Sequence, residues 1–271
     1  MVKCPDMKST LYVIGVGPGD PELLTLKAAR ILREATCLCV PKGREEGSSL
    51  ALSIIKGIVP LEGKEIIEAH FPMRKTRKGP GSRGMDPEEA QENAGIPTLA
   101  PGPLPLDPSV ELDAKWNETV ESVLNRLNRG IDVAFITIGD PTIYSTYFYL
   151  HDRLLKQSPG LRIEIIPGVS SINASAARAG VSLSLANEKI AILPANYIED
   201  IRTILQSFDT VVLMKVSKVF TQVRDLLNEM GLSGKAVYVA KAGMEDELII
   251  RDLNLVTDAD LNYFSQVIIK K

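Results

Sequence analysis

The chain has 271 residues, 45% of them hydrophobic and 24% charged, which is enough apolar material for a sizeable core and excludes a disordered or fibrous protein. Its 31 Lys and Arg residues against 34 Asp and Glu residues give a formal net charge of −3, which excludes a general attraction to nucleic acid or to an anionic membrane. No apolar run approaches the roughly 20 residues that cross a bilayer, so we expect no export or membrane insertion and a cytoplasmic location.

The cysteines and histidines predict neither a disulfide framework nor a metal site. Three cysteines, Cys4, Cys37 and Cys39, cannot all pair, and the last two alternate within an apolar stretch, as in a buried strand. We therefore expect reduced thiols. His70 and His151 lie far apart in the sequence with no cysteine pair near either, so no transition-metal site is expected.

The chain opens with a predicted strand, a glycine-rich turn and a helix. Leu11–Ile14 is a short β-prone run that stops at Gly15-Val16-Gly17-Pro18-Gly19-Asp20. Apolar residues recur at near-helical spacing over Glu22–Leu32, which predicts a helix. Cys37–Val40 then returns to β character, and Pro41 is expected to close that strand.

The alternation of strand and helix continues to the end of the chain. Strands are predicted at Ile131–Ile138, Arg162–Ile166, Lys189–Leu193, Thr210–Val216, Ala236–Ala240, Leu248–Asp252 and Ser265–Ile269, and helices at Tyr144–Lys156, Ser170–Ala179, Ile198–Phe208 and Val219–Met230. Strands separated by helices favour a parallel α/β architecture with ligand groups at the strand ends. A change of composition after Pro167-Gly168 predicts two α/β domains, residues 1–167 and 168–271.

A proline- and glycine-rich segment interrupts the first predicted domain. Residues 79–108 hold five of the 20 glycines and seven of the 17 prolines, so they are expected to form a long surface loop or a partly ordered insertion. Just before them, Arg74, Lys75, Arg77 and Lys78 place four positive charges in five residues. Such a cluster is typical of either a solvated face or a carboxylate-binding patch.

The glycine-rich turn matches neither common phosphate-binding motif. A dinucleotide fingerprint needs glycine at its first, third and sixth positions, and the sixth position counted from Gly15 is Asp20. No Gly-Lys-Ser or Gly-Lys-Thr ends the turn, and Pro18 removes a backbone donor that a phosphate would use. The motif instead predicts a rigid strand-to-helix turn in which Asp20 caps the next helix, with or without a ligand.

Two further turns follow predicted strands and open predicted helices. They are Gly139-Asp140-Pro141-Thr142-Ile143-Tyr144 and Ile166-Pro167-Gly168-Val169-Ser170-Ser171. In a parallel sheet, such turns expose backbone amides and carbonyls at a common edge, where ligands bind. We therefore expect the three turns to converge on one crevice, although each alone could be a plain connection.

Together the three turns resemble those of the tetrapyrrole (corrin/porphyrin) methyltransferase family. The resemblance runs from Leu11 to the end of the chain, but the segment 79–108 does not match the family pattern. Other motifs are similar to the branch of the family that methylates carbon 20 of precorrin-2 or cobalt-factor II. They are Phe71-Pro72-Met73, Tyr144-Ser145-Thr146-Tyr147, Leu213-Met214-Lys215-Val216, Ala242-Gly243-Met244-Glu245 and Tyr263-Phe264-Ser265.

The resemblance implies a homodimer of chains with two α/β domains, S-adenosylmethionine folded into the cleft between them, and the reduced tetrapyrrole in an adjoining trough. The implied cofactor positions are Pro18, Gly139, Asp140, Ile143, Tyr144, Ser170, Ser171, Ala195, Met214 and Gly243. The residue types alone leave Ala195 and Met214 open as packing residues, and Ser170 and Ser171 open as helix caps.

Methyl transfer from a sulfonium needs no enzyme nucleophile, which suits a sequence without an evident Ser/His/Asp or Cys/His constellation. The remaining requirement is alignment of sulfur, methyl and acceptor carbon. Asp20 is a candidate acceptor for the proton that leaves the ring, although helix capping explains it as well, and the catalytic residues stay unassigned. The cluster at Arg74, Lys75, Arg77 and Lys78 is the densest supply of positive charge for the substrate carboxylates.

Three alternatives stay open at this point. The chain could act on a different ring carbon, it could methylate diphthine precursors, or it could be a non-catalytic α/β protein that binds a small ligand. The sequence does not distinguish a cobalt-containing substrate from a metal-free one.

Overall fold

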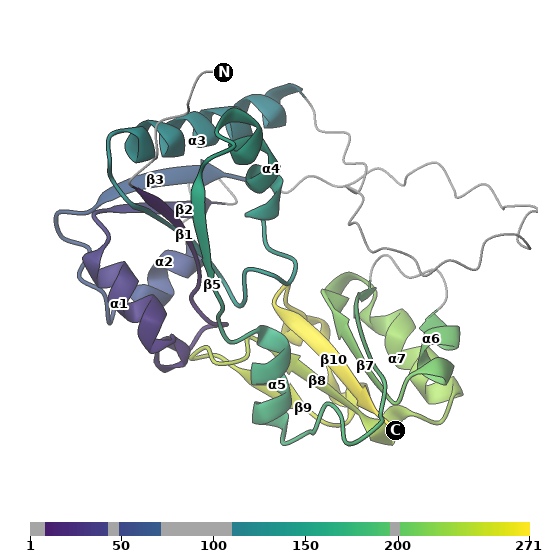
Figure 1. Cartoon of the computed structure of the whole chain (residues 1–271). Coiled ribbons are helices and arrows are strands. Elements are labelled where there is room, and N and C mark those ends of the chain that lie inside the picture. The colour runs from purple at the N-terminus through teal and green to yellow at the C-terminus, as the bar shows by residue number, and fades with distance from the viewer. Residues whose placement is uncertain (1–8, 43–48, 72–109, 196–200) are drawn as a thin grey trace, which may run out of the picture.

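The computed structural model describes residues 9–42, 49–71, 110–195 and 201–271 (Figure 1). These residues form two five-stranded sheets that follow one another along the chain, each covered by helices. The α/β architecture expected from the sequence is confirmed. Within the described ranges, no helix combines the length and the apolar character that a membrane span requires.

The first sheet is parallel throughout and has the strand order β3-β2-β4-β1-β5. Its strands are β1 (Thr10–Gly15), β2 (Cys37–Lys42), β3 (Glu65–His70), β4 (Val133–Thr137) and β5 (Arg162–Ile166). One face is covered by α1 (Leu26–Glu34) and α2 (Leu50–Ile55), and the other by α3 (Val110–Asn128) and α4 (Phe148–Gln157). We call this sheet with its four helices the first unit.

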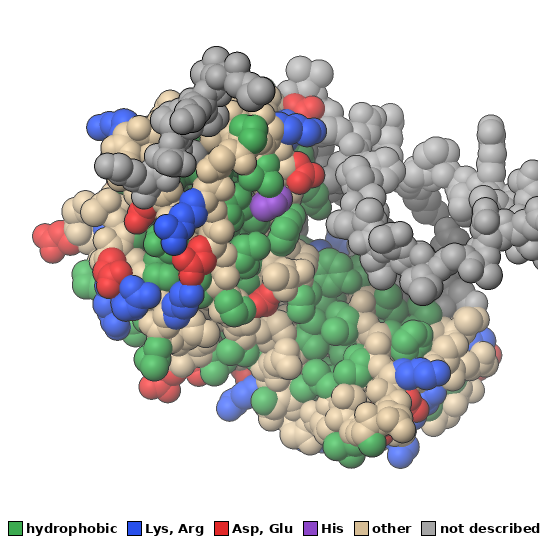
Figure 2. All heavy atoms as spheres, in the orientation of Figure 1, with side chains coloured by type: hydrophobic (Ala, Val, Ile, Leu, Met, Phe, Trp, Pro, Cys, Tyr) green, Lys and Arg blue, Asp and Glu red, His purple; other side chains and the backbone are tan. Residues whose placement is uncertain are grey.

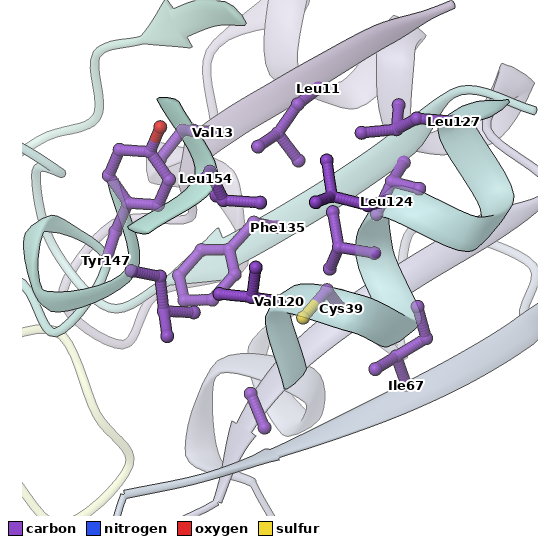
Figure 3. Packing of buried hydrophobic residues seen from close by; sticks show 14 of the residues in the cluster. Leu11, Val13, Cys39, Ile67, Val120, Leu124, Leu127, Phe135, Tyr147 and Leu154 are labelled. Atoms are coloured by element: carbon purple, nitrogen blue, oxygen red, sulfur yellow. The ribbon is translucent and has the colours of Figure 1, made fainter. Parts of the chain in front are cut away.

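Both faces of the first sheet are buried, which explains the nearly unbroken apolar run of β1. Leu11 and Val13 pack under α3 and α4 with Phe135 and Leu154, in the core that Figure 3 shows. Ile14 faces the opposite side and packs with α1 and α2. Successive side chains of a strand point to opposite faces, so a strand covered on both sides needs apolar residues at every position.

The second sheet is mixed, with the strand order β6-β7-β10-β8-β9, and among its described pairs β6 and β7 alone run parallel. Its strands are β6 (Ile190–Pro194), β7 (Thr210–Met214), β8 (Ala236–Ala240), β9 (Leu248–Ile250) and β10 (Ser265–Lys270). Helix α5 (Ser171–Ala179) covers one face, and α6 (Ile201–Ser207) and α7 (Phe220–Glu229) cover the other. We call this sheet with its three helices the second unit. Short 3-10 helices lie at Pro21–Leu23 (η1), Val216–Lys218 (η3), Ser233–Lys235 (η4), Leu253–Leu255 (η5) and Asp258–Asp260 (η6).

The chain passes from the first sheet to the second between Ile166, where β5 ends, and Ser171, where α5 begins. Helix α5 packs on the second sheet, because its apolar side chains, among them Ile172, share a cluster with Val212 and Val239. Small residues make up most of this helix, which lets it lie close to the strands.

Several expectations about the elements were wrong in detail. The helix predicted from Tyr144 begins at Phe148, because Tyr144 has a left-handed φ of 53°. The predicted helix Glu22–Leu32 is divided into η1 and α1, because Thr25 is the N-cap of α1 and its Oγ1 accepts the Ala28 N–H at 3.2 Å. Strand β2 continues through Pro41, which lies beyond Cys39, the last residue of β2 paired with β4. The second sheet is not parallel, because β8, β9 and β10 are joined without crossover α-helices.

Buried thiols and exposed charges agree with the composition. Cys37 and Cys39 are buried in β2, as predicted, and within the described residues neither forms a disulfide; Cys4 lies outside those residues. Figure 2 shows acidic and basic side chains interspersed around α1. Lys27 of that helix pairs with Glu164 at 2.5 Å. Such exposed pairs contribute little to stability, but the mixture of signs leaves no broad basic field on this part of the described surface.

Candidate active site

The first two glycine turns are joined at the same edge of the first sheet. Strands β4, β1 and β5 are parallel neighbours, so their carboxyl ends lie side by side. The turn after β1 pairs with the turn after β4 as a short antiparallel bridge, in which the Gly139 N–H donates to Gly17 O at 2.8 Å. The Val16 N–H also donates to Thr137 O at 2.9 Å. Two of the three turns that the sequence predicted to converge are therefore joined through their backbones.

Position 15 requires glycine because the backbones of three turns, at Gly15, Gly139 and Gly168, approach one another closely. A Cβ built on Gly15 would lie 2.5 Å from Gly139 O and 2.8 Å from Gly168 N. Gly139 also has a φ of 71°, in the left-handed region. No larger residue fits at Gly15 without moving main chain, so this glycine serves packing between turns.

Asp140 ties the second turn to the third. Its Oδ1 accepts the Thr142 N–H at 2.8 Å and also the Thr142 hydroxyl, and its Oδ2 accepts the Gly168 N–H at 3.0 Å. The carboxylate is thus occupied on both oxygens. The carboxylate therefore fixes the second and third turns relative to each other. Asp140 also lines the cleft that is described below.

The second unit meets the first glycine turn through the loop after β8. A Cβ built on Gly19 would lie 2.5 Å from Met244 Cγ, and one built on Gly243 would lie 3.2 Å from Asp20 N. Gly243 has a φ of 76°, so both the close approach and the backbone conformation favour glycine.

A cleft of about 520 Å³ lies between the two units. Its first wall comes from the turns after β1 and β4, the end of β2 and the start of α2. Its second wall comes from the end of β7, the loop after β8, and the starts of β10 and α5. Its lining is largely apolar, and within the described residues its charged members are Lys42, Asp140 and Lys215. This size and mixture are usual for small-molecule sites.

Eight of the ten expected cofactor positions line this cleft. They are Pro18, Gly139, Asp140, Ile143, Tyr144, Ser170, Ser171 and Met214. Ala195 is not among the lining residues. It is buried in the core of the second unit, so it is a packing residue, one of the two roles considered for it from the sequence. Gly243 is not among the lining residues; it lies between Ala242 and Met244, which are, and packs against Asp20 of the first turn.

The other expected site residues are the basic cluster and Asp20. Arg74, Lys75, Arg77 and Lys78 fall outside the described residues. Asp20 is not among the lining residues; it is the N-cap of η1, and its Oδ1 accepts the Glu22 N–H at 2.8 Å.

Ser170 combines a capping role with a place in the cleft wall. It is the N-cap of α5, where its Oγ accepts the Asn173 N–H at 3.3 Å and donates to Asn173 Oδ1 at 2.7 Å. Gln266 holds the other side of this helix end, because its Nε2 donates to Ser171 O at 2.8 Å and to Ser175 Oγ at 2.5 Å. The wall is therefore fixed by β10 as well as by the turn.

Tyr144 crosses from the first unit to the second. Its hydroxyl donates to Ile192 O at 3.4 Å, and its ring lies under the Lys215 ammonium, with 5.4 Å from Nζ to the ring centroid. Partial burial raises the pKa of Tyr144 above its ordinary value, so the hydroxyl is a neutral donor at physiological pH.

Sequence reasoning assigned no site role to Lys42, Lys215 or Gln266, which also line the cleft. Lys42 ends β2 and Lys215 directly follows β7, so both stand at carboxyl ends of strands. Gln266 is near the start of β10, which runs antiparallel to β7 and so brings its amino end to the same place. A search of strand ends for polar residues could have found the two lysines, but not the glutamine.

Comparison with known proteins gives the same fold and one family. The family model of the Tetrapyrrole (Corrin/Porphyrin) Methylases matches residues 10–254. The cobalt-precorrin-2 C(20)-methyltransferase of Salmonella typhimurium is 34% identical over 267 residues, which cover 98% of each chain. The probable cobalt-precorrin-2 C(20)-methyltransferase of Methanocaldococcus jannaschii is 33% identical and covers 96% of each chain.

Two solved structures share the arrangement of both units. A cobalt precorrin-4 methyltransferase has a TM-score of 0.66 at 22% identity, covering 100% of this chain and 98% of its own. A uroporphyrin-III C-methyl transferase from Thermus thermophilus, complexed with S-adenyl homocysteine, has a TM-score of 0.59 at 19% identity and covers 97% of this chain and 92% of its own. With a family model that matches nearly the whole length and relatives above 30% identity, the chain belongs to the tetrapyrrole (corrin/porphyrin) methylases.

Proposed function

We propose that this chain is an S-adenosylmethionine-dependent methyltransferase that methylates carbon 20 of precorrin-2 or cobalt-factor II in the biosynthesis of the corrin ring. The observation that carries the proposal is the 34% identity to a cobalt-precorrin-2 C(20)-methyltransferase over 98% of both chains. The two chains match from end to end, so the likeness includes both walls of the cleft. A likeness confined to one unit would support a shared fold only.

The cleft suits S-adenosylmethionine by its chemistry. It offers apolar walls for the adenine, hydroxyls at Thr137 and Ser171, and main chain from the turns at Gly139 and Pro18. We propose that eight residues hold the cofactor, with Gly243 packing against the first turn. The eight are Pro18, Gly139, Asp140, Ile143, Tyr144, Ser170, Ser171 and Met214. When bound, this cofactor supplies a methyl group that is already electrophilic on its sulfonium.

The chain's own residues then act by positioning. Among the charged residues of the lining, the Asp140 carboxylate is occupied by Thr142 and Gly168, and Lys42 is paired with Glu68 at 2.9 Å. These groups shape the site and are already engaged within the protein. Holding reacting atoms in line within about 3–3.5 Å can lower a barrier by roughly 7–11 kcal/mol in favourable cases. We therefore propose alignment as the main catalytic device.

The reduced tetrapyrrole is rich in carboxylates and needs positive charge. We propose that Arg74, Lys75, Arg77 and Lys78 supply part of it. What supports this role is their place in the sequence, three to seven residues after Phe71, which lines the cleft and whose N–H donates to Lys42 O at 2.9 Å.

Three further properties are part of the proposal. We place the domain boundary at 167/168, supported by the packing of α5 on the second sheet. We propose a homodimer, supported by the exposed apolar side chains of Ile165, Leu185 and Ile192, and a sedimentation equilibrium measurement tests it. We propose a cytoplasmic location, which the buried unpaired Cys37 and Cys39 suit; fractionation of cells tests it.

The experiment that tests the activity is an anaerobic incubation with methyl-labelled S-adenosylmethionine and either metal-free precorrin-2 or its cobalt complex. We expect label on the ring, with NMR of the product placing the new methyl on carbon 20. Label on another carbon would assign the chain to a different step. Cofactor binding without any transfer would make it a ligand-binding protein and overturn the proposal. The two substrate arms also show whether cobalt is required.

A further inference from the structure

Two residues with left-handed backbone meet inside the cleft, one from each unit. Tyr144 has a φ of 53° and Lys215 a φ of 56°, and residues other than glycine adopt this region uncommonly. Both line the cleft, and the Lys215 Nζ lies 5.4 Å from the centroid of the Tyr144 ring. Such backbone conformations persist only where the surrounding structure holds them, and they concentrate at functional sites.

The surroundings of both residues hold them in place. The Lys215 N–H donates to Ser265 O at 3.0 Å, directly after the pairing of Met214 with Gln266 of β10. On the other side, the Tyr144 hydroxyl donates to Ile192 O of β6. The positions of the lysine and of the ring are thus set by three strands of the second sheet.

Lys215 differs from the other charged residues of the lining in its partners. Lys42 is paired with Glu68, and both oxygens of Asp140 are occupied. Within the described part of the chain, the contact found for the Lys215 ammonium is the face of the Tyr144 ring, and no acidic side chain pairs with it. A cation over a ring is held electrostatically and keeps its N–H donors for another acceptor.

The ligand that such an ammonium selects is a carboxylate. Charge-assisted hydrogen bonds are stronger than neutral ones, and the apolar side chains of Ile143 and Met214 in the same lining lower the local dielectric. Two carboxylates could reach the cleft, one on the tetrapyrrole and one on the methionyl part of the cofactor. Half-exposed aromatic rings line the cleft with Lys215, namely Tyr144, Tyr263 and Phe264, and they offer apolar faces to a flat macrocycle.

We propose that Lys215 binds a carboxylate of the tetrapyrrole and that the Tyr144 ring is the positioning group that holds its ammonium. This inference rests on the proposed function and adds a specificity residue to it. It is independent of the basic cluster at residues 74–78, because it stands on contacts within the described residues.

The test compares Lys215→Met and Lys215→Arg with the control Lys218→Met. Methionine keeps the length of the side chain and places the same demand on the left-handed backbone, so the comparison isolates the charge. Lys218 is an exposed lysine three residues later that is not among the lining residues. Dissociation constants are measured under anaerobic conditions by absorbance titration for the cobalt-loaded tetrapyrrole and by calorimetry for S-adenosylhomocysteine. Circular dichroism confirms that each variant folds.

We expect Lys215→Met to weaken tetrapyrrole binding about 10- to 100-fold, the range expected for losing a hydrogen bond to a charged group. Its KM should rise with kcat largely retained, and its affinity for S-adenosylhomocysteine should stay within about twofold of wild type. Lys215→Arg should recover most of the binding, and Lys218→Met should match wild type. Tyr144→Phe, which keeps the ring face, should bind the tetrapyrrole more tightly than Tyr144→Leu.

Two results would overturn the inference. A folded Lys215→Met protein with wild-type affinity for the tetrapyrrole would remove the lysine from recognition. Weakened S-adenosylhomocysteine binding with unchanged tetrapyrrole binding would assign the carboxylate to the cofactor. Failure of the proposed function looks different, because wild-type protein would then transfer no methyl group to either form of the ring.

Discussion

The carboxylate of Asp140 accepts the backbone N–H of Gly168 at 3.0 Å, and so joins two turns that lie 28 residues apart in the sequence. The same carboxylate accepts the N–H of Thr142 within its own turn. A single side chain therefore sets the spacing of two backbone segments at the cleft. We expect it to contribute both to the stability of the fold and to the shape of the site.

Replacing Asp140 by Ala should lower the free energy of unfolding by about 1.5–3 kcal/mol, because charge-assisted hydrogen bonds are lost at both turns. Affinity for S-adenosylhomocysteine should fall as well, since the turns lose their common anchor. Urea denaturation and calorimetry measure the two effects. Asp152→Ala, at an exposed position of α4, is the matched control. Wild-type stability in the Asp140 variant would mean that the turns hold each other without the carboxylate.

Gly15→Ala should destabilise the fold by about 1–3 kcal/mol or more, because the added Cβ would lie 2.5 Å from Gly139 O, and neither backbone can move freely. Gly57→Ala adds the same atom where no neighbour lies within 4 Å, so its stability should stay within about 0.5 kcal/mol of wild type. Thermal and urea unfolding of the two variants check the difference. Equal behaviour of the pair would contradict the packing of the turns.

Gly139→Arg should abolish S-adenosylhomocysteine binding by filling the cleft with a long side chain. Gly139→Ala separates this effect from backbone strain, since the φ of 71° costs any L-residue roughly 1–2 kcal/mol whatever its size. A Cβ at this position has nothing closer than 3.9 Å, so alanine should bind the cofactor far better than arginine does. Calorimetry with the folded variants measures their affinity for S-adenosylhomocysteine. Undiminished binding by the arginine variant would refute this placement of the cofactor.

The buried thiols should resist alkylation in the native protein. Burial, with a smaller contribution from the Glu65 carboxylate, raises the pKa of Cys37 from 9.0 to about 11, and burial raises the pKa of Cys39 further. At pH 8 about one Cys37 thiol in a thousand would then be ionised, and access to it is closed as well. Iodoacetamide labelling followed by peptide mass spectrometry should show slow modification of both residues, and rapid modification in urea.

The raised pKa of Cys37 also predicts how the stability of the protein depends on pH. Because the folded state keeps the Cys37 thiol protonated, the stability that it contributes is complete below pH 9 and is lost as the pH rises from about 9 to 11. Cys37→Ala should lose less stability than wild type over that window. The midpoints of urea unfolding, measured at pH 8 and pH 10.5, compare the two proteins. Equal losses of stability in both would show that ionisation of the Cys37 thiol is not coupled to unfolding.

Replacing Arg74 and Lys75 together by Ala should raise the KM for the tetrapyrrole about 10-fold or more, while the affinity for S-adenosylhomocysteine stays near that of wild type. The matched control replaces Lys218 and Lys235, two exposed lysines away from the cleft lining. Steady-state kinetics at fixed ionic strength measure the effect. Unchanged kinetics would place the pair on a solvated face, which is the alternative that the sequence left open.

The sequence by itself determined the parts of this protein that depend on local chemistry. A glycine directly after an apolar run marks a turn that only a small residue allows, so the turns at Gly15, Gly139 and Gly168 could be predicted along with the strands before them. The Ser170 cap of α5 could be predicted for the same reason, since it depends on residues three positions apart.

Tertiary structure decided what depends on which distant segments become neighbours. The antiparallel place of β10 between β7 and β8 brings Gln266 to the cleft, and no local pattern marks that pairing. The contact between Tyr144 and Lys215 arises only when the two units face each other. Ala195 shows the converse, because a position beside a strand end does not reveal whether its side chain faces the cleft or the core. Local propensity cannot encode such long-range pairing, which is set by the packing of whole sheets and helices.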